Sequence, residues 1–322
     1  MAVLEAMPRL NELSIFAPGP HSVQEFSVET SSSSKPPKPL FIVTPTEPGK
    51  YPILQFYHGT VLINTYYRQV LQLIASHGYI VVAPQLYQPW DVVVLMCACL
   101  EVQDAGKVIN WLPKPSPEGL QSVLPENVTC DTTQIGLAGH SRGGKTAFAV
   151  ALGDADTNLK FQALIGIDPV AGSSKSICCR TCPHILTYKP QSFDLSIPVT
   201  VIGTGLGGES VSECMIPMPA CAPEGVNHTE FYRECKAPCG RYVATDYGHM
   251  DMLDDDLGLY GNVCECMCKK GKAQRDPMRR FVGGIVVASL KAGFNGDFVD
   301  LKTIAEDPQV APVKLQDSQY TE

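Results

Sequence analysis

A Gly-His-Ser-Arg-Gly run at residues 139–143, between an apolar segment and a helical one, limits the folds open to this chain more than any other part of its sequence. In that setting the pattern G-x-S-x-G is typical of a nucleophile elbow, a sharp turn that presents a serine at the end of a strand. Glycine on either side lets the following helix approach the neighbouring strands without a clash. Ser141 would stand at a helix N-terminus, where N–H groups favour a developing oxyanion. The run predicts a serine nucleophile; the alternative is an ordinary glycine-rich strand–helix turn.

The remainder of the chain, from about residue 40 to 291, alternates short apolar runs with helical stretches. The expected strands are Leu40–Thr44, Pro52–Tyr57, Tyr79–Pro84, Gln134–Ala138, Ala163–Ile167, Val199–Ile202 and Arg241–Thr245. The expected helices are Tyr66–His77, Val102–Leu112, Arg142–Leu152 and Pro277–Lys291. Strands that are continuously apolar, rather than alternating, are typical of a parallel sheet buried on both faces. The pattern therefore predicts a doubly wound α/β domain, with a mostly parallel sheet and helices on both faces.

The composition of the chain suggests three parts. Residues 1–38 read as a flexible N-terminal segment, 39–295 as the catalytic domain, and 296–322 as a C-terminal tail. Within the domain, the loops 205–240 and 254–275 are rich in Gly, Pro and Cys and show no period. Loops of this length are usually functional or cross-linked. We expect both near the carboxyl ends of the last strands, where α/β sheets place their ligands.

Charge and hydropathy exclude two classes of function. Lys plus Arg is 25 and Asp plus Glu is 33, so the formal net charge is −8, and no basic run argues for a nucleic-acid partner. The longest apolar run, Val92–Leu100, is too short for a membrane-spanning helix. Residues 1–20 carry Glu5, Glu12 and scattered prolines, so they do not resemble a signal peptide and do not show a clear plastid transit peptide.

Cysteine is unusually frequent, with 13 residues, ten of them between Cys178 and Cys268. The odd count leaves at least one thiol unpaired. The Cys179–Cys182 pair has CxxC spacing, but a structural zinc site would need a second such pair in a compact finger, so we expect no metal. Disulfides that staple the long loops and free buried thiols both remain open.

A serine hydroxyl needs a base to take its proton, and in this fold the base is a histidine after the last strand. Of the seven histidines, His249 follows the expected strand Arg241–Thr245 directly. We therefore expect His249 to be the base, with His184 and His228 as the alternatives.

The acid that orients the histidine has two candidates. Asp168 stands at the C-terminal tip of the buried strand Ala163–Ile167, and Glu209 lies in the loop after the next strand. An ionised carboxylate at a buried strand end needs a partner, which the imidazole of His249 would supply. We favour Asp168 and keep Glu209 as the alternative.

The oxyanion hole should combine two backbone N–H groups. One belongs to Arg142, which follows the serine, and the other to Thr60 or Val61, which follow the His-Gly pair at the end of an early strand.

Apolar residues near this loop would line a substrate cleft, or would instead belong to the core or surface. These residues are Val61, Leu62, Ile63 and Trp90.

The run Gly139–Phe148 strongly resembles the lipase-type motif of plant chlorophyllases. Three further blocks, in the same order along residues 40–295, are similar to that family: Phe56–Gly59, Ile167–Pro169 and Tyr247–Asp254. The resemblance implies an α/β-hydrolase fold and hydrolysis of the phytyl ester of chlorophyll to chlorophyllide and phytol through an acyl-enzyme. It also implies a Ser141–His249–Asp168 triad, which supports Asp168 over Glu209.

The resemblance carries further expectations about partners and compartment. The substrate would be a small hydrophobic ester, its magnesium would arrive with it, and the enzyme would need no cofactor. The resemblance implies the chloroplast, with the cytosol or endoplasmic reticulum as alternatives, and leaves peripheral membrane association open. Two rival functions remain: another lipase or esterase of the same fold for smaller or phospholipid esters, and an inactive hydrolase-fold carrier of lipids or tetrapyrroles.

Overall fold

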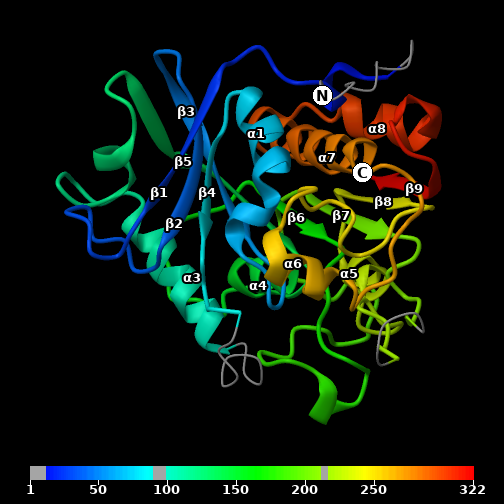
Figure 1. Cartoon of the computed structure of the whole chain (residues 1–322). Helices are drawn as coiled ribbons and strands as arrows, with labels where there is room; N and C mark the ends of the chain where they lie inside the picture. Colours follow the sequence, from blue (N-terminus) through cyan, green and yellow to red (C-terminus); the bar gives the residue numbers. More distant parts are fainter. Residues whose placement is uncertain (1–11, 90–98, 212–216) are drawn as a thin grey trace.

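The centre of the molecule is a nine-stranded sheet with the order β1-β2-β4-β3-β5-β6-β7-β8-β9 (Figure 1). The computed structural model describes residues 12–89, 99–211 and 217–322. The strands are β1 (Val23–Val28), β2 (Leu40–Pro45), β3 (Gly49–Tyr57), β4 (Ile80–Pro84), β5 (Val128–His140), β6 (Ala163–Ile167), β7 (Val199–Thr204), β8 (Cys239–Ala244) and β9 (Leu315–Thr321).

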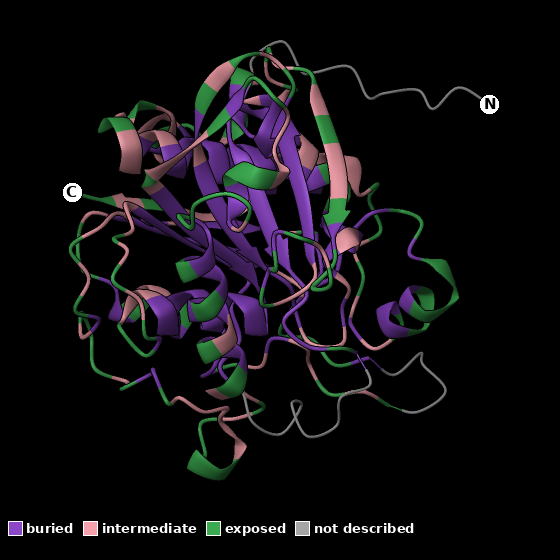
Figure 2. Cartoon of the chain, turned by 90° about the vertical axis from the view of Figure 1, so that its left-hand side faces the viewer, coloured by how far each residue is buried: buried purple, intermediate pink, exposed green. Residues whose placement is uncertain are grey.

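Six neighbouring strands of this sheet, from β4 to β8 in spatial order, run parallel. The strands β1, β2 and β9 are antiparallel to their neighbours and lie toward the two edges. Every residue of β4, β6 and β7 is buried, as Figure 2 shows for the middle of the sheet. Their continuous apolar character follows from burial on both faces.

Helices cover both faces of the sheet. The helices are α1 (Arg68–Ser76), α3 (Cys99–Trp111), α4 (Arg142–Ala151), α5 (His228–Glu234), α6 (Gly258–Glu265), α7 (Asp276–Asn295) and α8 (Val299–Glu306). Short 3₁₀ helices are η1 (Ser14–Phe16), η2 (Asn64–Tyr67), η3 (Leu120–Val123), η4 (Ile177–Cys179) and η5 (Pro308–Val310). One face packs against α1 and α7, and the other against α4 and α5, with α3 beside α4. The predicted doubly wound sheet is therefore confirmed.

The long helix α7 shows how local sequence fixes an element. Asp276 and Pro277 begin it, which suits the first turn because an acid complements the helix dipole and proline has no N–H to leave unpaired. Gly296 ends it in the left-handed region (φ 67°), and its N–H donates to the carbonyl of Ala292. Between these ends, α7 is mostly buried against the sheet and α1. No helix within residues 12–89, 99–211 or 217–322 is long and apolar enough to cross a bilayer.

The sheet extends beyond the expected 39–295 domain at both ends. β1 pairs with β2, and β9 pairs with β8, so both flanking segments contribute an edge strand. The N-terminal segment is also anchored by the Trp111 indole, whose N–H donates to the carbonyl of Ser34 at 2.7 Å. The expected boundaries at 38 and 296 therefore do not coincide with the edges of the sheet. Edge strands are half-exposed and polar, so they lack the apolar run that marks a central strand.

The two Cys-rich loops are only partly irregular. Helix α5 lies within 205–240, and α6 lies within 254–275. A disulfide between Cys221 and Cys268 joins the two loops, and a second links Cys99 to Cys182. Buried thiols also occur, at Cys235, Cys239 and Cys264. Disulfides and free buried thiols, the two alternatives that the cysteine count left open, therefore both occur.

Candidate active site

Ser141 occupies the sharp turn between β5 and α4. Its φ and ψ are 56° and −124°, a conformation that residues with a side chain rarely adopt. Three backbone hydrogen bonds hold it there: its N–H donates to the carbonyl of Ile167 (2.9 Å), and its carbonyl accepts from the N–H groups of Lys145 (3.2 Å) and Val170 (3.1 Å). Hydrogen bonds to α4, to the end of β6 and to the segment that follows β6 therefore hold the strained turn in place.

The glycines of the motif are required by close backbone approach. A Cβ at position 143 would lie 2.3 Å from the carbonyl oxygen of Tyr57 and 2.5 Å from that of His58. A Cβ at position 139 would lie 2.2 Å from the carbonyl oxygen of Gly143. A larger residue at position 143 would therefore push α4 away from the end of β3, and one at position 139 would push α4 away from β5, and the serine would move with the helix.

His249 and Asp168 meet in a short hydrogen bond. The Nδ1 of His249 lies 2.6 Å from Oδ2 of Asp168, and both side chains are buried. Asp168 follows β6, and His249 lies in the loop after β8. Because parallel strands end at the same edge of the sheet, these residues converge beside Ser141. Thr204 at the end of β7 donates its hydroxyl to Oδ2 of Asp168 (2.6 Å) and its N–H to Oδ1 (3.3 Å).

These contacts keep the aspartate ionised. Burial by itself would raise the pKa of Asp168, but the hydrogen bond and charge of His249 outweigh it, and the Thr204 hydroxyl adds to them. The resulting pKa is about 2. The carboxylate can therefore hold the Nδ1–H of the imidazole, which leaves Nε2 as the acceptor nitrogen.

The rival acid and bases differ from Asp168 and His249 in their surroundings, although His228 lies close enough for its charge to act on Asp168. Glu209 is exposed in the loop after β7, and His184 is exposed as well. His228 is buried on α5, where its Nδ1 lies 3.3 Å from a guanidinium nitrogen of Arg241. Of the two carboxylates considered from the sequence, the structure brings Asp168 to His249.

The loop that should provide the second oxyanion donor is fixed at Gly59. Its N–H donates to the hydroxyl of Tyr67 (3.0 Å), and its carbonyl accepts from the hydroxyl of Tyr87 (3.1 Å). The Nδ1 of His58 lies 2.9 Å from the same carbonyl, and its Nε2 accepts the N–H of Leu86 (3.1 Å). Burial lowers the pKa of His58 to about 4, which keeps the ring neutral.

His140, the second residue of the motif, joins this loop to His249. Its Nδ1 accepts the hydroxyl of Tyr67 (2.8 Å), and its Nε2–H donates to the carbonyl of His249 (2.9 Å). Burial, assisted by the nearby His249, holds the pKa of His140 well below its usual range. A continuous set of hydrogen bonds therefore runs from Gly59 through Tyr67 and His140 to the backbone of His249. His140 was not among the bases expected from the sequence, and nothing in the sequence indicated this positioning contact.

Arg142 belongs to a buried ion pair that the sequence did not reveal. Its Nε lies 2.7 Å from a carboxylate oxygen of Glu101 on α3, and its guanidinium stacks 5.1 Å from the ring centroid of Tyr87. The hydroxyl of Thr146 donates to the other oxygen of Glu101 (2.7 Å). Burial raises the pKa of Glu101 despite the opposing charge of Arg142. The pair fixes the first turn of α4 against α3.

Ser141 and His249 open into a cavity of about 560 Å³. Both predicted oxyanion residues line it, as do several apolar and sulfur-containing side chains. The lining comprises Thr60, Val61, Leu62, His140, Ser141, Arg142, Val170, Gly172, Ser173, Cys178, Cys179, Arg180, Thr181, Ala220, Cys221, Pro223, His249, Met250, Cys264, Met267 and Cys268. Of the predicted substrate residues, Val61 and Leu62 belong to the lining. Ile63 is not part of it and packs against the core, and Trp90 lies outside the described residues.

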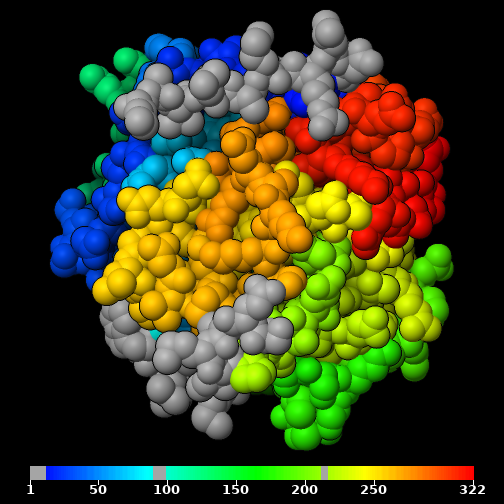
Figure 3. Space-filling view, turned by 45° about the vertical axis from the view of Figure 1, so that its right-hand side comes forward, coloured from blue at the N-terminus to red at the C-terminus, as the bar shows by residue number. Residues whose placement is uncertain are grey.

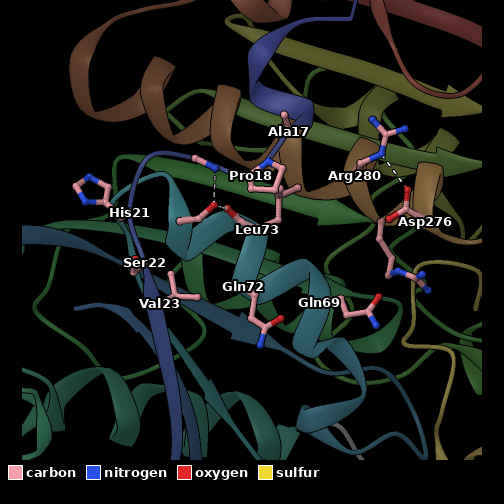
Figure 4. Close-up of a pocket in the computed structure, with 13 residues that line it drawn as sticks. Ala17, Pro18, His21, Ser22, Val23, Gln69, Gln72, Leu73, Asp276 and Arg280 are labelled. Carbon is pink, nitrogen blue, oxygen red and sulfur yellow. Dashed lines mark hydrogen bonds and ion pairs between the residues drawn. The ribbon is translucent and has the colours of Figure 1, made fainter. Parts of the chain in front are cut away.

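A second cavity, of about 610 Å³, lies between the N-terminal segment, α1 and the start of α7 (Figure 4). Its charged side chains are engaged with one another or with nearby groups: Arg280 contacts Asp276 (3.0 Å) and Glu12, and Arg279 contacts Asp255. Neither Ser141 nor His249 contributes to its lining. Within residues 12–89, 99–211 and 217–322, no three His, Cys, Asp or Glu side chains are grouped so as to hold a metal ion.

Comparison with known proteins gives a consistent result. The family model described as Chlorophyllase matches residues 11–322. Chlorophyllase-1 of Arabidopsis thaliana is 50% identical over 327 residues, covering 99% of this chain and 97% of the relative. Chlorophyllase-1, chloroplastic, of Citrus unshiu is 48% identical, covering 96% and 89%, and Chlorophyllase-2 of Arabidopsis thaliana is 45% identical, covering 89% and 87%.

Proposed function

This chain belongs to the chlorophyllase family and is a carboxylic ester hydrolase acting on chlorophyll, and we propose that Ser141, His249 and Asp168 carry out the reaction. The observation that carries this proposal is the 2.6 Å contact between His249 and Asp168 beside the cavity that Ser141 lines. A neutral imidazole oriented by a buried carboxylate is the base that a serine nucleophile requires.

In the first half-reaction, the Ser141 hydroxyl attacks the carbonyl carbon of the phytyl ester while Nε2 of His249 takes its proton. The carbonyl oxygen becomes an oxyanion, which accepts hydrogen bonds from the N–H groups of Thr60 and Arg142. The bond to the phytyl oxygen then breaks, and His249 returns the proton to that oxygen. Phytol leaves, and the chlorophyllide acyl group remains esterified to Ser141.

In the second half-reaction, His249 takes a proton from water, and the water oxygen attacks the acyl carbon. Collapse of this intermediate breaks the bond to Oγ, and His249 returns the proton to Ser141. Chlorophyllide departs with a free carboxyl group. Asp168 stays ionised throughout and stabilises the imidazolium that forms in each half. The residues supply all the proton transfers, and the magnesium of chlorophyll belongs to the substrate.

The compartment and the physical form of the substrate follow from the family. Citrus relatives are named chloroplastic, and this chain is accordingly a chloroplast enzyme. Chlorophyll is a hydrophobic small molecule that resides in membranes, so we propose that the enzyme reaches it by peripheral association and has no nucleic-acid partner.

The proposal is tested with purified protein and chlorophyll a, by measuring the transfer of pigment into a water-rich phase as chlorophyllide. Ser141→Ala should abolish this transfer and leave the thermal midpoint nearly unchanged, because the hydroxyl contributes little to packing. Parallel assays with p-nitrophenyl esters separate a chlorophyllase from an esterase for smaller acyl groups. Activity of Ser141→Ala within tenfold of the parent would overturn the nucleophile assignment.

A further inference from the structure

Large hydrophobic side chains are exposed at few positions, and those positions are unevenly distributed. Within the described parts of the chain they are Leu100, Ile177, Leu259, Tyr260, Val263 and Val299. Three of the six lie on α6, and Ile177 lies on η4. Both of these elements also contribute to the lining of the substrate cavity, α6 through Cys264 and η4 through Cys178 and Cys179. Exposed apolar surface is thus concentrated beside the mouth of the active site.

Helix α6 has two faces with different environments. Gly261 and Cys264 point inward: Gly261 packs near the ring of Tyr66, and Cys264 reaches the loop at Val61. Leu259 and Val263 are four residues apart, on one side of the helix, and are 86% and 59% exposed. The helix is therefore held by one face, while an apolar face is left in contact with solvent.

The exposed face of α6 carries no charge. Glu265 is the single charged residue in the helix, and it is buried and paired with Lys270 and Arg275. Tyr260 is 40% exposed and adds a ring with a polar tip, a side chain suited to the boundary between lipid and water. Placing the side chains of this face in lipid would require no charge within the helix to lose its hydration, and the exposed Asp256, whose carboxylate accepts the N–H of Gly258, lies just before the helix.

The size of the face decides between a membrane and a second protein copy. A stable dimer buries about 800 Å² on each partner, which is far more than three side chains of one short helix provide. A few apolar side chains that enter the headgroup region are sufficient for reversible membrane binding. In Figure 3, α6 (gold) and the segment that follows it (orange) lie together on one outer face of the molecule.

We propose that the exposed face of α6, formed by Leu259, Tyr260 and Val263, docks the enzyme on a lipid bilayer, with Ile177 of η4 as a second contact. The ester bond of a membrane-resident substrate then passes from lipid into the cavity without crossing bulk water. This inference rests on the proposed function, because it is the hydrophobic substrate that makes a membrane the partner. Apolar burial drives the docking, since the chain carries a net charge of −8 and would be repelled by an anionic surface.

Flotation with phosphatidylcholine vesicles tests the docking face directly. The parent protein should float with the vesicles, and the double variant Leu259→Ser, Val263→Ser should bind at least about tenfold more weakly. Val299→Ser is the matched control, because Val299 is 66% exposed on α8, away from the cavity, and should bind within about twofold of the parent. Adding anionic phosphatidylglycerol should not strengthen binding.

Failure of the parent to float, equal binding by the double variant, or an equal loss in Val299→Ser would each overturn the proposal. A concentration-dependent dimer that the double variant abolishes, seen by light scattering, would assign the face to a second copy instead.

Activity measurements separate this proposal from the proposed function. The double variant should hydrolyse a soluble p-nitrophenyl ester and detergent-dispersed chlorophyll at the parental rate, because neither residue lines the cavity. It should lose activity on chlorophyll in vesicles in proportion to its lost binding. Ser141→Ala should float like the parent. Vesicle binding can therefore be measured whether or not Ser141 is the nucleophile. Reduced activity of the double variant on the soluble ester would contradict a pure docking role.

Discussion

The floor and the rim of the substrate cavity are built in different ways. The floor consists of residues at the carboxyl ends of parallel strands, where Ser141, Asp168 and His249 are buried and held by hydrogen bonds of 2.6–3.3 Å. The rim consists of α6, η4 and irregular segments, which expose apolar side chains and are cross-linked by Cys221–Cys268. The proposed catalytic residues are therefore positioned by the pairing of the strands, whereas access to them depends on segments that lie outside the sheet.

The first prediction concerns the floor and carries the largest effect. Asp168→Asn retains the size of the side chain but offers an amide where the imidazole needs an anion. It should reduce kcat about 10³–10⁴-fold with a much smaller change in KM, which is the signature of lost transition-state stabilisation. Steady-state kinetics on a soluble ester give both values.

Glu209→Gln is the control for Asp168→Asn, because Glu209 is an exposed carboxylate in the loop after β7. We expect less than about a fivefold effect. If the two variants exchanged their effects, the acid would have to be moved to Glu209.

The second prediction concerns the rim. Cys221→Ser breaks the disulfide to Cys268, which spans 47 residues, and a cross-link over such a loop contributes about 4 kcal/mol in the chain-entropy model. The thermal midpoint should fall by several degrees, while kcat on a soluble ester at 25 °C stays within about threefold. Cys130→Ser, which removes a half-buried free thiol, should leave the midpoint nearly unchanged. A fall in kcat of more than about threefold at 25 °C would show that the positions of the floor residues depend on the rim.

The third prediction concerns the contact between Gly59 and His140. Tyr67→Phe removes the hydroxyl that accepts the N–H of Gly59 and donates to His140, so the oxyanion loop loses one of the hydrogen bonds that hold it. We expect kcat to fall about tenfold with little change in KM, as for the loss of one buried hydrogen bond that acts on the transition state.

Tyr242→Phe is the matched control, since its buried hydroxyl donates to the carbonyl of Leu301, on α8. It should lower the thermal midpoint to a similar extent and leave kcat unaltered. Equal losses of kcat in both variants would show that Tyr67 stabilises the fold and does not specifically position the oxyanion loop.

The floor could largely be predicted from the sequence because its signals are local. The elbow is a short run with fixed glycine positions, and Asp168 and His249 each follow a recognisable apolar strand. Knowing that parallel strands end at one edge is enough to bring these residues together.

The contacts that link the floor could not be predicted in the same way. Tyr67 and His140 are 73 residues apart, and Glu101 and Arg142 are 41 apart, so no local pattern joins them. For the rim, the sequence placed the two Cys-rich loops near the site but did not predict helix α6 or the disulfide pairing, since α6 lies within a stretch rich in Cys and Gly, and a count of 13 cysteines does not specify a pairing.

The fourth prediction has the smallest effect and uses pH. Because burial lowers the pKa of His58 to about 4 in the folded protein, the unfolded chain binds more protons between that value and the ordinary 6.5. The stability from neutral His58 is complete above pH 6.5 and is lost as pH falls toward 4, by about 1.4 kcal/mol per unit at most. Denaturant unfolding of His58→Gln should therefore show a pH dependence shallower by about one proton in this window. An unchanged slope would mean that His58 is protonated when folded.

Covalent labelling tests whether Ser141 is the nucleophile activated by the floor of the cavity. A fluorophosphonate should add once per chain, the modified peptide should contain Ser141, and chlorophyll hydrolysis should disappear in step with the label. His249→Gln should react far more slowly, because the serine proton would have no acceptor. Stoichiometric labelling at another residue, or full chlorophyll hydrolysis by protein labelled at Ser141, would show that Ser141 is not the nucleophile.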